Sequence, residues 1–324
     1  MLDLVAVVVG LILLLVGAWL VVRSGVRLAV MWGVSRVVIG ATIVGFGTSA
    51  PEFVVSLIAA LRDSPGIAIG NVLGSNVANV ALVLGVSALI APLSVDFRLL
   101  RWEIPVLAAA TAGVIVLAQN GSLGQVEGLV LFGGLVAFVV LSPRLFPELT
   151  AAFEAEEEAE EEAERLSPPL PRDPRLVIYE FAWLSAGIAG LTLGASFAVE
   201  GGVAIAQRAG LSEIAIGATI VAIGTSLPEL ATSIVAAFRR EHEIAVANVV
   251  GSNIFNLLGV LGLTAAIAGL PIDGDLYHFE LPALAASTLV LVPLAWPRYR
   301  IGRADGAALI SIYVLFTVAT LRWT

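Results

Sequence analysis

The sequence contains no cysteine and no lysine, and only two of its 324 residues are histidine. The absence of cysteine excludes disulfides and thiolate metal sites, and both histidines, His242 and His278, fall in predicted loops. Charged residues are also scarce, at 13% of the chain, against about 25% in a soluble domain. The apolar part of the chain therefore lacks the usual ligands of zinc, copper and nickel.

Hydrophobic residues, by contrast, make up 59% of the chain, and the mean hydropathy is +0.99. Apolar windows of about 16–25 residues are too long for barrel strands and predict an all-α integral membrane protein. The first window lacks a basic leader and is expected to be a retained span. The ten predicted transmembrane helices cover 4–22, 37–61, 67–91, 103–119, 124–141, 177–199, 214–238, 244–270, 280–296 and 304–321.

One long connection, 142–176, separates the ten spans into two groups of five. It carries a glutamate-rich run, Glu154–Glu164, and a proline-rich stretch, Pro168–Pro174. The run lacks the Asp/Asn/Gly spacing of a calcium-binding loop, so a solvated linker is favoured over a Ca²⁺ sensor. The predicted organisation is a first five-helix repeat at 1–147, an acidic linker at 148–175 and a second five-helix repeat at 176–324.

The arginines predict the orientation of the chain in the membrane. With the N-terminus outside, 14 of the 17 arginines fall in inner loops and 3 fall outside. Because inner loops are enriched in basic residues, both termini are expected outside and the acidic linker in the cytoplasm. The expected location is the cell (plasma) membrane.

Two stretches 177 residues apart are near copies of each other. Ile39–Arg62 and Ile216–Arg239 are identical at 15 of 24 positions, and each contains a glutamate, Glu52 or Glu229. Since five spans separate the copies, an odd number, the second copy enters the membrane from the opposite face. Inverted repeats of this kind place substrate sites at their interface near the midplane, so Glu52 and Glu229 are expected to meet there.

Each copy also contains a predicted helix break. Ser49-x-Pro51-Glu52 and Ser226-x-Pro228-Glu229 have the form of a capping box with a first-turn proline, placed inside a span. A helix that stops and restarts within the bilayer must line a polar cavity or be buried in protein. We therefore predict that helices 2 and 7 are broken and that their freed carbonyl oxygens face a cation.

The span after each break supplies further oxygen atoms. Asn71, Ser75 and Asn79 share one helical face, as do Asn248, Ser252 and Asn256. Gly74 and Gly251 are expected to let another helix approach closely. For Asn71, Asn76, Asn248 and Asn253, hydrogen bonding between helices explains the polarity at least as well as ion binding. Glu103 and Glu280, near span starts, are expected at the membrane interface.

The candidate ligands are all oxygen atoms, which favours Ca²⁺, Na⁺ or H⁺. Two glutamates carry a charge of −2, which one Ca²⁺, two Na⁺ or two protons would balance. An exchanger requires such shared neutralisation. A cation channel is the alternative of another class, and the spans contain no nucleophile–base motif that would indicate an enzyme.

The chain resembles the cation/Ca²⁺ antiporter superfamily, specifically the microbial sodium/calcium exchangers, over nearly its whole length. The resemblance lies in ten spans, two inverted repeats and two copies each of Gly-Thr-Ser-x-Pro-Glu and Gly-Ser-Asn-x-x-Asn. It implies that Glu52 and Glu229 are shared Ca²⁺ and Na⁺ ligands and that Asn79 and Asn256 complete the ring. The residues it places at flanking Na⁺ sites are Thr48, Ser49, Ser75, Thr225, Ser226 and Ser252.

The resemblance further implies Na⁺/Ca²⁺ antiport by alternating access, in which spans one and six move across a rigid core. A Ca²⁺/H⁺ antiporter of the same fold is the alternative. Many relatives carry aspartate where this chain has Asn256, which keeps an oxygen but cannot ionise, and this argues against K⁺ co-transport. No cofactor, nucleic acid or obligatory protein partner is expected beyond the lipid bilayer and the transported ions.

Overall fold

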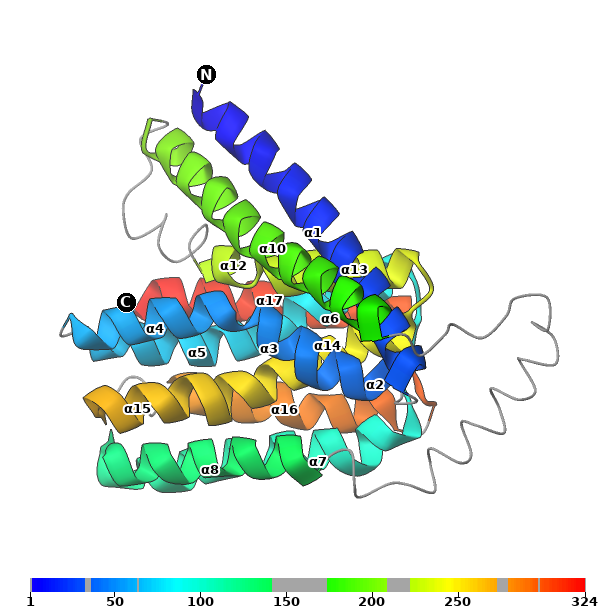
Figure 1. The fold of residues 1–324 in the computed structure, drawn as a ribbon. Helices are drawn as coiled ribbons and strands as arrows, with labels where there is room; N and C mark the ends of the chain where they lie inside the picture. The colour runs from blue at the N-terminus through cyan, green and yellow to red at the C-terminus, as the bar shows by residue number, and fades with distance from the viewer. Residues whose placement is uncertain are drawn as a thin grey trace.

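The computed structural model describes residues 2–32, 36–62, 64–141, 174–208, 222–272, 279–296 and 298–323. Nearly all of these residues are helical, which confirms the predicted class. One long helix pair lies obliquely across the remaining helices (Figure 1). Most of the predicted linker at 148–175 and the start of the predicted span 214–238 lie outside the described residues.

The first half of the chain contains five helical stretches, several of them interrupted by π-helical turns. Its elements are α1 (Leu2–Trp32), α2 (Arg36–Ile39), η1 (Gly40–Val44), α3 (Gly45–Thr48), α4 (Ala50–Leu61), α5 (Pro65–Ala78), η2 (Asn79–Val83), α6 (Leu84–Ile90), β1 (Leu93–Ser94), η3 (Leu99–Glu103), α7 (Ile104–Leu117), η4 (Ala118–Asn120), β2 (Ser122–Leu123) and α8 (Gln125–Leu141).

The second half repeats this order over its described residues. Its elements are α10 (Pro174–Arg208), α12 (Ala222–Thr225), α13 (Leu227–Phe238), α14 (His242–Ile254), η6 (Phe255–Leu261), α15 (Gly262–Ala268), β3 (Leu270–Pro271), α16 (Leu281–Ala295), β4 (Arg300–Ile301) and α17 (Arg303–Trp323).

Several of the described helices are long and apolar enough to cross a membrane. Six pass by length and composition alone, and Gly40–Thr48 with Ala50–Leu61 adds a seventh as a pair bent by 47°. The shorter apolar helices Gln125–Leu141, Leu227–Phe238 and Leu281–Ala295 accompany them. The most apolar window of His242–Ala268 is entirely buried, so this helix lies at the centre of the protein.

Two helices extend beyond the spans that the sequence predicts. The prediction ends the first span at residue 22, but α1 continues to Trp32, and α10 covers 174–208 instead of 177–199. The hydropathy pattern stops at Arg23 because an arginine is expected in water. In the fold, Arg23 and Arg27 contact a carboxylate on α10, so the helix continues past them.

Helices α1 and α10 pack against each other through glycine. A Cβ atom at Gly10 would lie 2.6 Å from the carbonyl oxygen of Gly194, and one at Gly17 would lie 2.7 Å from that of Gly187. Without side chains at these positions the two backbones touch, as is common where helices associate in lipid. The pair forms the oblique layer in Figure 1.

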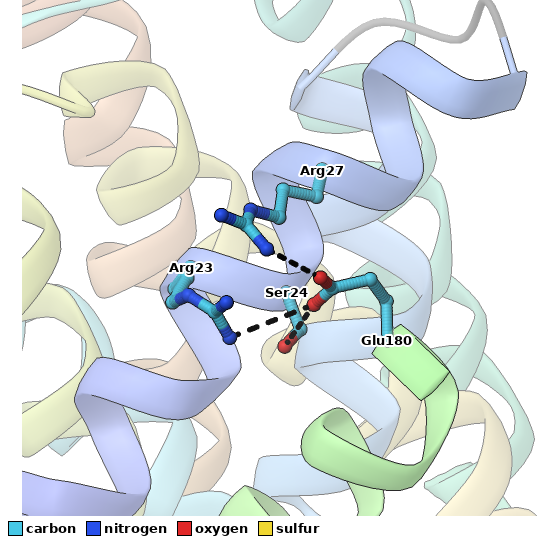
Figure 2. A network of polar contacts seen from close by, with 4 residues as sticks. All are labelled: Arg23, Ser24, Arg27 and Glu180. Carbon is cyan, nitrogen blue, oxygen red and sulfur yellow. Dashed lines mark hydrogen bonds and ion pairs between the residues drawn. The ribbon is translucent and has the colours of Figure 1, made fainter. Parts of the chain in front are cut away.

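A buried polar cluster joins the same two helices near one end. Figure 2 shows Glu180 of α10 pointing between three side chains of α1. Its Oε1 accepts a hydrogen bond from Arg27 Nη1 at 2.6 Å, and its Oε2 accepts one from Ser24 Oγ at 3.1 Å and lies 3.7 Å from Arg23 Nη1. The Glu180 side chain is almost fully buried, so these partners satisfy a charge that would otherwise be costly.

Two short antiparallel strand pairs tie the halves together outside the helices. β1 pairs with β4, placing Leu93 opposite Ile301, and β2 pairs with β3, placing Leu123 opposite Leu270. Each pair joins a strand from one half to a strand from the other. The hydropathy pattern gives no signal for such two-residue strands.

Candidate functional site

The helix break predicted in each sequence copy is present. α3 ends at Thr48 and α4 begins at Ala50, with Ser49 between them, while Ser226 separates α12 from α13. The backbone angles match, at φ −81° and ψ 2° for Ser49 and φ −86° and ψ 5° for Ser226. Proline lies in the first turn of each new helix, where its missing N–H costs no hydrogen bond.

The capping-box hydrogen bonds expected from the sequence do not form. Ser49 and Ser226 occupy the N-cap positions, but neither side chain caps its helix. Ser49 Oγ instead donates a long hydrogen bond, 3.5 Å, to Glu229 Oε1 in the other half. The serine therefore contacts the second glutamate across the protein because the carboxylate is a stronger acceptor than a local backbone group.

Glu52 and Glu229 lie in the first turns of α4 and α13, and both are fully buried. Their carboxylates are close enough for the two charges to interact directly. Among the described residues, neither Glu52 carboxylate oxygen nor Glu229 Oε2 has a hydrogen-bond partner. Buried carboxylates without donors are rare unless a cation or a proton neutralises them.

Hydroxyl groups from opposite halves pair on either side of the two glutamates. Thr48 Oγ1 lies 3.0 Å from Ser252 Oγ, and Thr225 Oγ1 lies 3.4 Å from Ser75 Oγ. All four residues are buried. Each break is thus brought beside the polar helix of the other half, as the repeated motifs predict.

Asn79 and Asn256 also lie in this region, each within a π-helical turn, η2 or η6. Asn79 Nδ2 donates to Asn253 Oδ1 at 3.0 Å, which leaves Asn79 Oδ1 without a partner among the described residues. Asn256 has no hydrogen-bond partner there for either amide atom. π-helical turns are common at functional sites because they displace one side chain from the regular helix surface.

A second set of asparagines holds the broken helices in place. Asn71 Nδ2 donates to Ser56 Oγ at 2.9 Å, and Asn248 Nδ2 donates to Ser233 Oγ at 3.1 Å. Each amide also reaches the backbone carbonyl of its own half's glutamate, at 3.3 Å and 3.5 Å. The interpretation as interhelical hydrogen bonding is therefore correct for Asn71 and Asn248. The sequence analysis missed Ser56 and Ser233, although both recur at the spacing of the repeat.

Close helix contact at Gly251 brings the hydroxyls of Thr48 and Ser252 together. A Cβ atom at Gly251 would lie 2.3 Å from the carbonyl oxygen of Ala41, so only glycine fits. This confirms the close approach predicted for Gly251. The segment equivalent to Ala41 in the second half lies outside the described residues.

Glu103 is not at the membrane interface, contrary to expectation. It is fully buried and pairs with Arg98, whose Nε donates to Glu103 Oε1 at 3.1 Å. Its position at the start of a span suggested contact with water, but a buried arginine five residues earlier provides the counter-charge instead. The pair anchors η3 to the core and is separate from the glutamate site.

The arrangement around Glu52 and Glu229 has the chemistry of a site for hard cations. Among the described residues, no three His, Cys, Asp or Glu side chains gather into a metal-binding cluster. A cation bound here would therefore depend on hydroxyl, amide and carbonyl oxygens beside the two carboxylates. Oxygen ligands of this kind suit Ca²⁺ and Na⁺ and give little affinity for softer metals.

Known proteins with similar sequences support this chemistry. CaxA from Alkalimonas amylolytica is 38% identical over 319 residues, which cover 95% of each chain. The sodium/calcium exchanger MaX1 from Methanosarcina acetivorans is 30% identical over 338 aligned positions, again covering 95% of each chain.

Solved structures agree. A structure of the sodium–calcium exchanger NCX_Mj, soaked with 10 mM Na⁺ and zero Ca²⁺, superposes with a TM-score of 0.81 at 30% identity and covers 99% of both chains. A family described as "Sodium/calcium exchanger protein" matches residues 2–143 and 179–322, and so includes both copies of the motif. The chain belongs to the sodium/calcium exchanger protein family, a family of transporters and not of enzymes.

Proposed function

We propose that this protein exchanges Na⁺ for Ca²⁺ across the membrane at a site shared by its two halves. The observation that carries the proposal is the buried pair of Glu52 and Glu229, whose charges interact while three of their four oxygens lack a described partner. One Ca²⁺ balances the pair, and Na⁺ ions balance it in turn. An unneutralised pair is costly in lipid, by about 2–3 kcal/mol for each charge on insertion scales, which opposes movement of the empty site.

The proposed ligands are the residues that the breaks and the polar helices bring together. Glu52 and Glu229 bind both ions, and the side-chain oxygens of Asn79 and Asn256 complete the central ring. The Thr48–Ser252 and Ser75–Thr225 pairs hold Na⁺ on either side. Ser49 and Ser226 contribute at the breaks, and the partnerless Ser226 Oγ supports this role.

We further propose ten transmembrane helices arranged as two inverted five-helix repeats, with helices 2 and 7 broken. Contacts between residues 177 apart support a pseudo-two-fold axis. Thr111 Oγ1 lies 3.0 Å from Thr288 Oγ1, and Asn253 Nδ2 donates to the carbonyl oxygen of Asn76 at 3.1 Å. A residue meets its own equivalent only near a two-fold axis.

The arginine distribution supports an orientation with both termini outside and the linker at 148–175 in the cytoplasm of a plasma-membrane protein. In that orientation, the Glu180 cluster lies at the cytoplasmic end of the α1–α10 pair. We propose that the repeats 1–147 and 176–324 provide a rigid core around the site. The α1–α10 pair then moves across this core to open the site to either side.

Flux measurements in reconstituted liposomes test the proposal. Sodium-loaded liposomes should take up ⁴⁵Ca²⁺ against a gradient, and the uptake should persist with a protonophore present. Glu52→Gln and Glu229→Gln should each abolish it, because the pair then no longer balances Ca²⁺. Glu127→Gln, on α8 and away from the site, is the matched control and should exchange normally.

The same assay separates the alternatives. Uptake driven by a pH gradient without sodium would replace the proposal with Ca²⁺/H⁺ exchange, which the family assignment does not favour. Current without counter-ion coupling would indicate a channel. Uptake that survives both glutamine substitutions would show that the site is elsewhere.

A further inference from the structure

Two glycines lie directly beside proposed ion ligands and are covered by the same helix. Gly47 precedes Thr48, and Gly224 precedes Thr225. A Cβ atom at Gly47 would lie 2.4 Å from Ile188 Cδ1, and one at Gly224 would lie 2.2 Å from Val199 Cγ2. Neither glycine can carry a side chain while these apolar groups are in place.

Both covering side chains belong to α10. Ile188 and Val199 are 11 residues apart, about three helical turns, so they project from one face of the helix. α10 contacts both short helices that precede the breaks, α3 and α12. One helix therefore covers the backbone beside both outer parts of the proposed site.

These contacts do not follow the repeat symmetry. At the spacing of 177 residues, the equivalents of Ile188 and Val199 are Leu11 and Val22 of α1. A symmetric structure would place Leu11 against Gly224 and Val22 against Gly47. Instead the atoms nearest to both glycines come from α10, and the Leu11 side chain is 48% exposed.

We propose that Gly47 and Gly224 are two sockets that α10 and α1 occupy in turn. In the state described here, Ile188 fills the socket at Gly47 and Val199 fills the socket at Gly224. In the opposite-facing state the repeats exchange roles, so Val22 fills the first socket and Leu11 the second. A methyl group seated beside Thr48 or Thr225 excludes water from that threonine, so the occupant of each socket decides when an ion can leave. This inference rests on the proposed exchange and inverted repeat.

Engineered disulfides test the sockets directly, because the natural chain contains no cysteine. The Cβ atom of Val199 would lie 3.5 Å from a Cβ at Gly224, within the range for a disulfide. Oxidation of the Val199→Cys/Gly224→Cys variant should remove both thiols from maleimide counting and stop ⁴⁵Ca²⁺ uptake. Reductant should restore both. Ile188→Cys/Gly47→Cys is the equivalent variant at the other socket, for use if the first does not fold.

A second variant tests the exchange of occupants. Leu11→Cys/Gly224→Cys should form a disulfide during turnover, with sodium inside the liposomes and calcium outside. Leu15→Cys/Gly224→Cys, one helical turn away, is the matched control and should not. Absence of the Leu11 cross-link, or full exchange by the oxidised Val199 variant, would overturn the proposal.

The outcomes for the two proposals are distinguishable. Thiol counting requires no transport, so the Val199–Gly224 cross-link is readable in any folded protein. A wild-type chain without sodium-driven uptake would refute the exchange function. Normal exchange in the wild type together with failed Leu11 cross-linking would refute only the alternation between α10 and α1.

Discussion

At the scale of single residues, Asn256 is the position where this chain differs most informatively from its expected pattern. Its amide lies buried within η6 with no partner among the described residues, whereas the equivalent Asn79 donates to Asn253. The two halves thus differ in hydrogen bonding at matched positions. A neutral side chain also limits the proposed site to two negative charges.

Asn256→Asp tests the importance of that neutrality. A protonated aspartic acid resembles asparagine in size and is uncharged, so exchange should be retained at acidic pH. As the pH rises and the carboxyl ionises, a third charge enters the site, and Ca²⁺ uptake should acquire a pH dependence that the wild type lacks. The measurement is initial ⁴⁵Ca²⁺ uptake between pH 5 and pH 9, with wild-type protein in parallel.

The same substitution at a matched position serves as the control. Asn79→Asp introduces the equivalent charge, but there it also alters the hydrogen bond to Asn253. It should therefore lower exchange at every pH. An Asn256→Asp variant whose uptake follows the wild-type pH profile would show that residue 256 does not influence the bound ion.

At the scale of elements, the α1–α10 pair depends on different contacts at its two ends. Glu180 is buried against Arg23 and Arg27 at one end, whereas Asp3 pairs with a largely exposed Arg208 at the other. Glu180 and Asp3 are themselves 177 residues apart and occupy equivalent positions. A buried ion pair whose partner is removed costs more than an exposed one.

Glu180→Gln should therefore destabilise the protein more than Asp3→Asn. Because Arg23 and Arg27 keep partial contact with solvent, we expect a loss of about 1–2 kcal/mol, below the roughly 3–5 kcal/mol of a fully buried pair. Asp3→Asn should cost less than about 0.5 kcal/mol. Thermal or denaturant unfolding in one detergent measures both variants, and equal effects would contradict the assignment of Glu180 as the buried anchor.

At the scale of the whole molecule, the proposed orientation makes opposite predictions for two exposed positions. Ser94 lies in β1, and Gln119 lies in η4 after the next helix. With both termini outside, Ser94→Cys should react with an impermeant maleimide only after the cells are opened, while Gln119→Cys should react in intact cells. The wild-type chain, which lacks cysteine, gives the background. The reverse pattern would invert the topology.

Much of the architecture was predictable from the sequence because lipid restricts the chain so strongly. Backbone groups in the bilayer must bond within a helix, so long apolar windows identified helices such as α5 and α8 to within a few residues. The breaks at Ser49 and Ser226 were also predictable, since proline and a buried glutamate recur together inside a span. The family resemblance drawn from these motifs is confirmed over both halves.

Other features depended on pairwise contacts that periodicity does not record. The sequence predicted α1 to end at Arg23 because it gave no indication that Glu180 lies opposite. It predicted a capping role for Ser49, although the serine contacts Glu229 in the other half. It placed Glu103 at the interface because the counter-charge of Arg98 depends on how η3 folds back into the core.

The sequence by itself determined the helical membrane class, the family, the broken helices and the set of oxygen-bearing residues, because each follows from local composition and an exact spacing of 177. Only the tertiary structure decided which groups meet. It paired Thr48 with Ser252 and Ser75 with Thr225 across the halves, and it seated Ile188 and Val199 of one helix on two glycines related by the repeat. A repeated sequence specifies equivalent positions, whereas the packing of the α1–α10 pair determines where their equivalence ends.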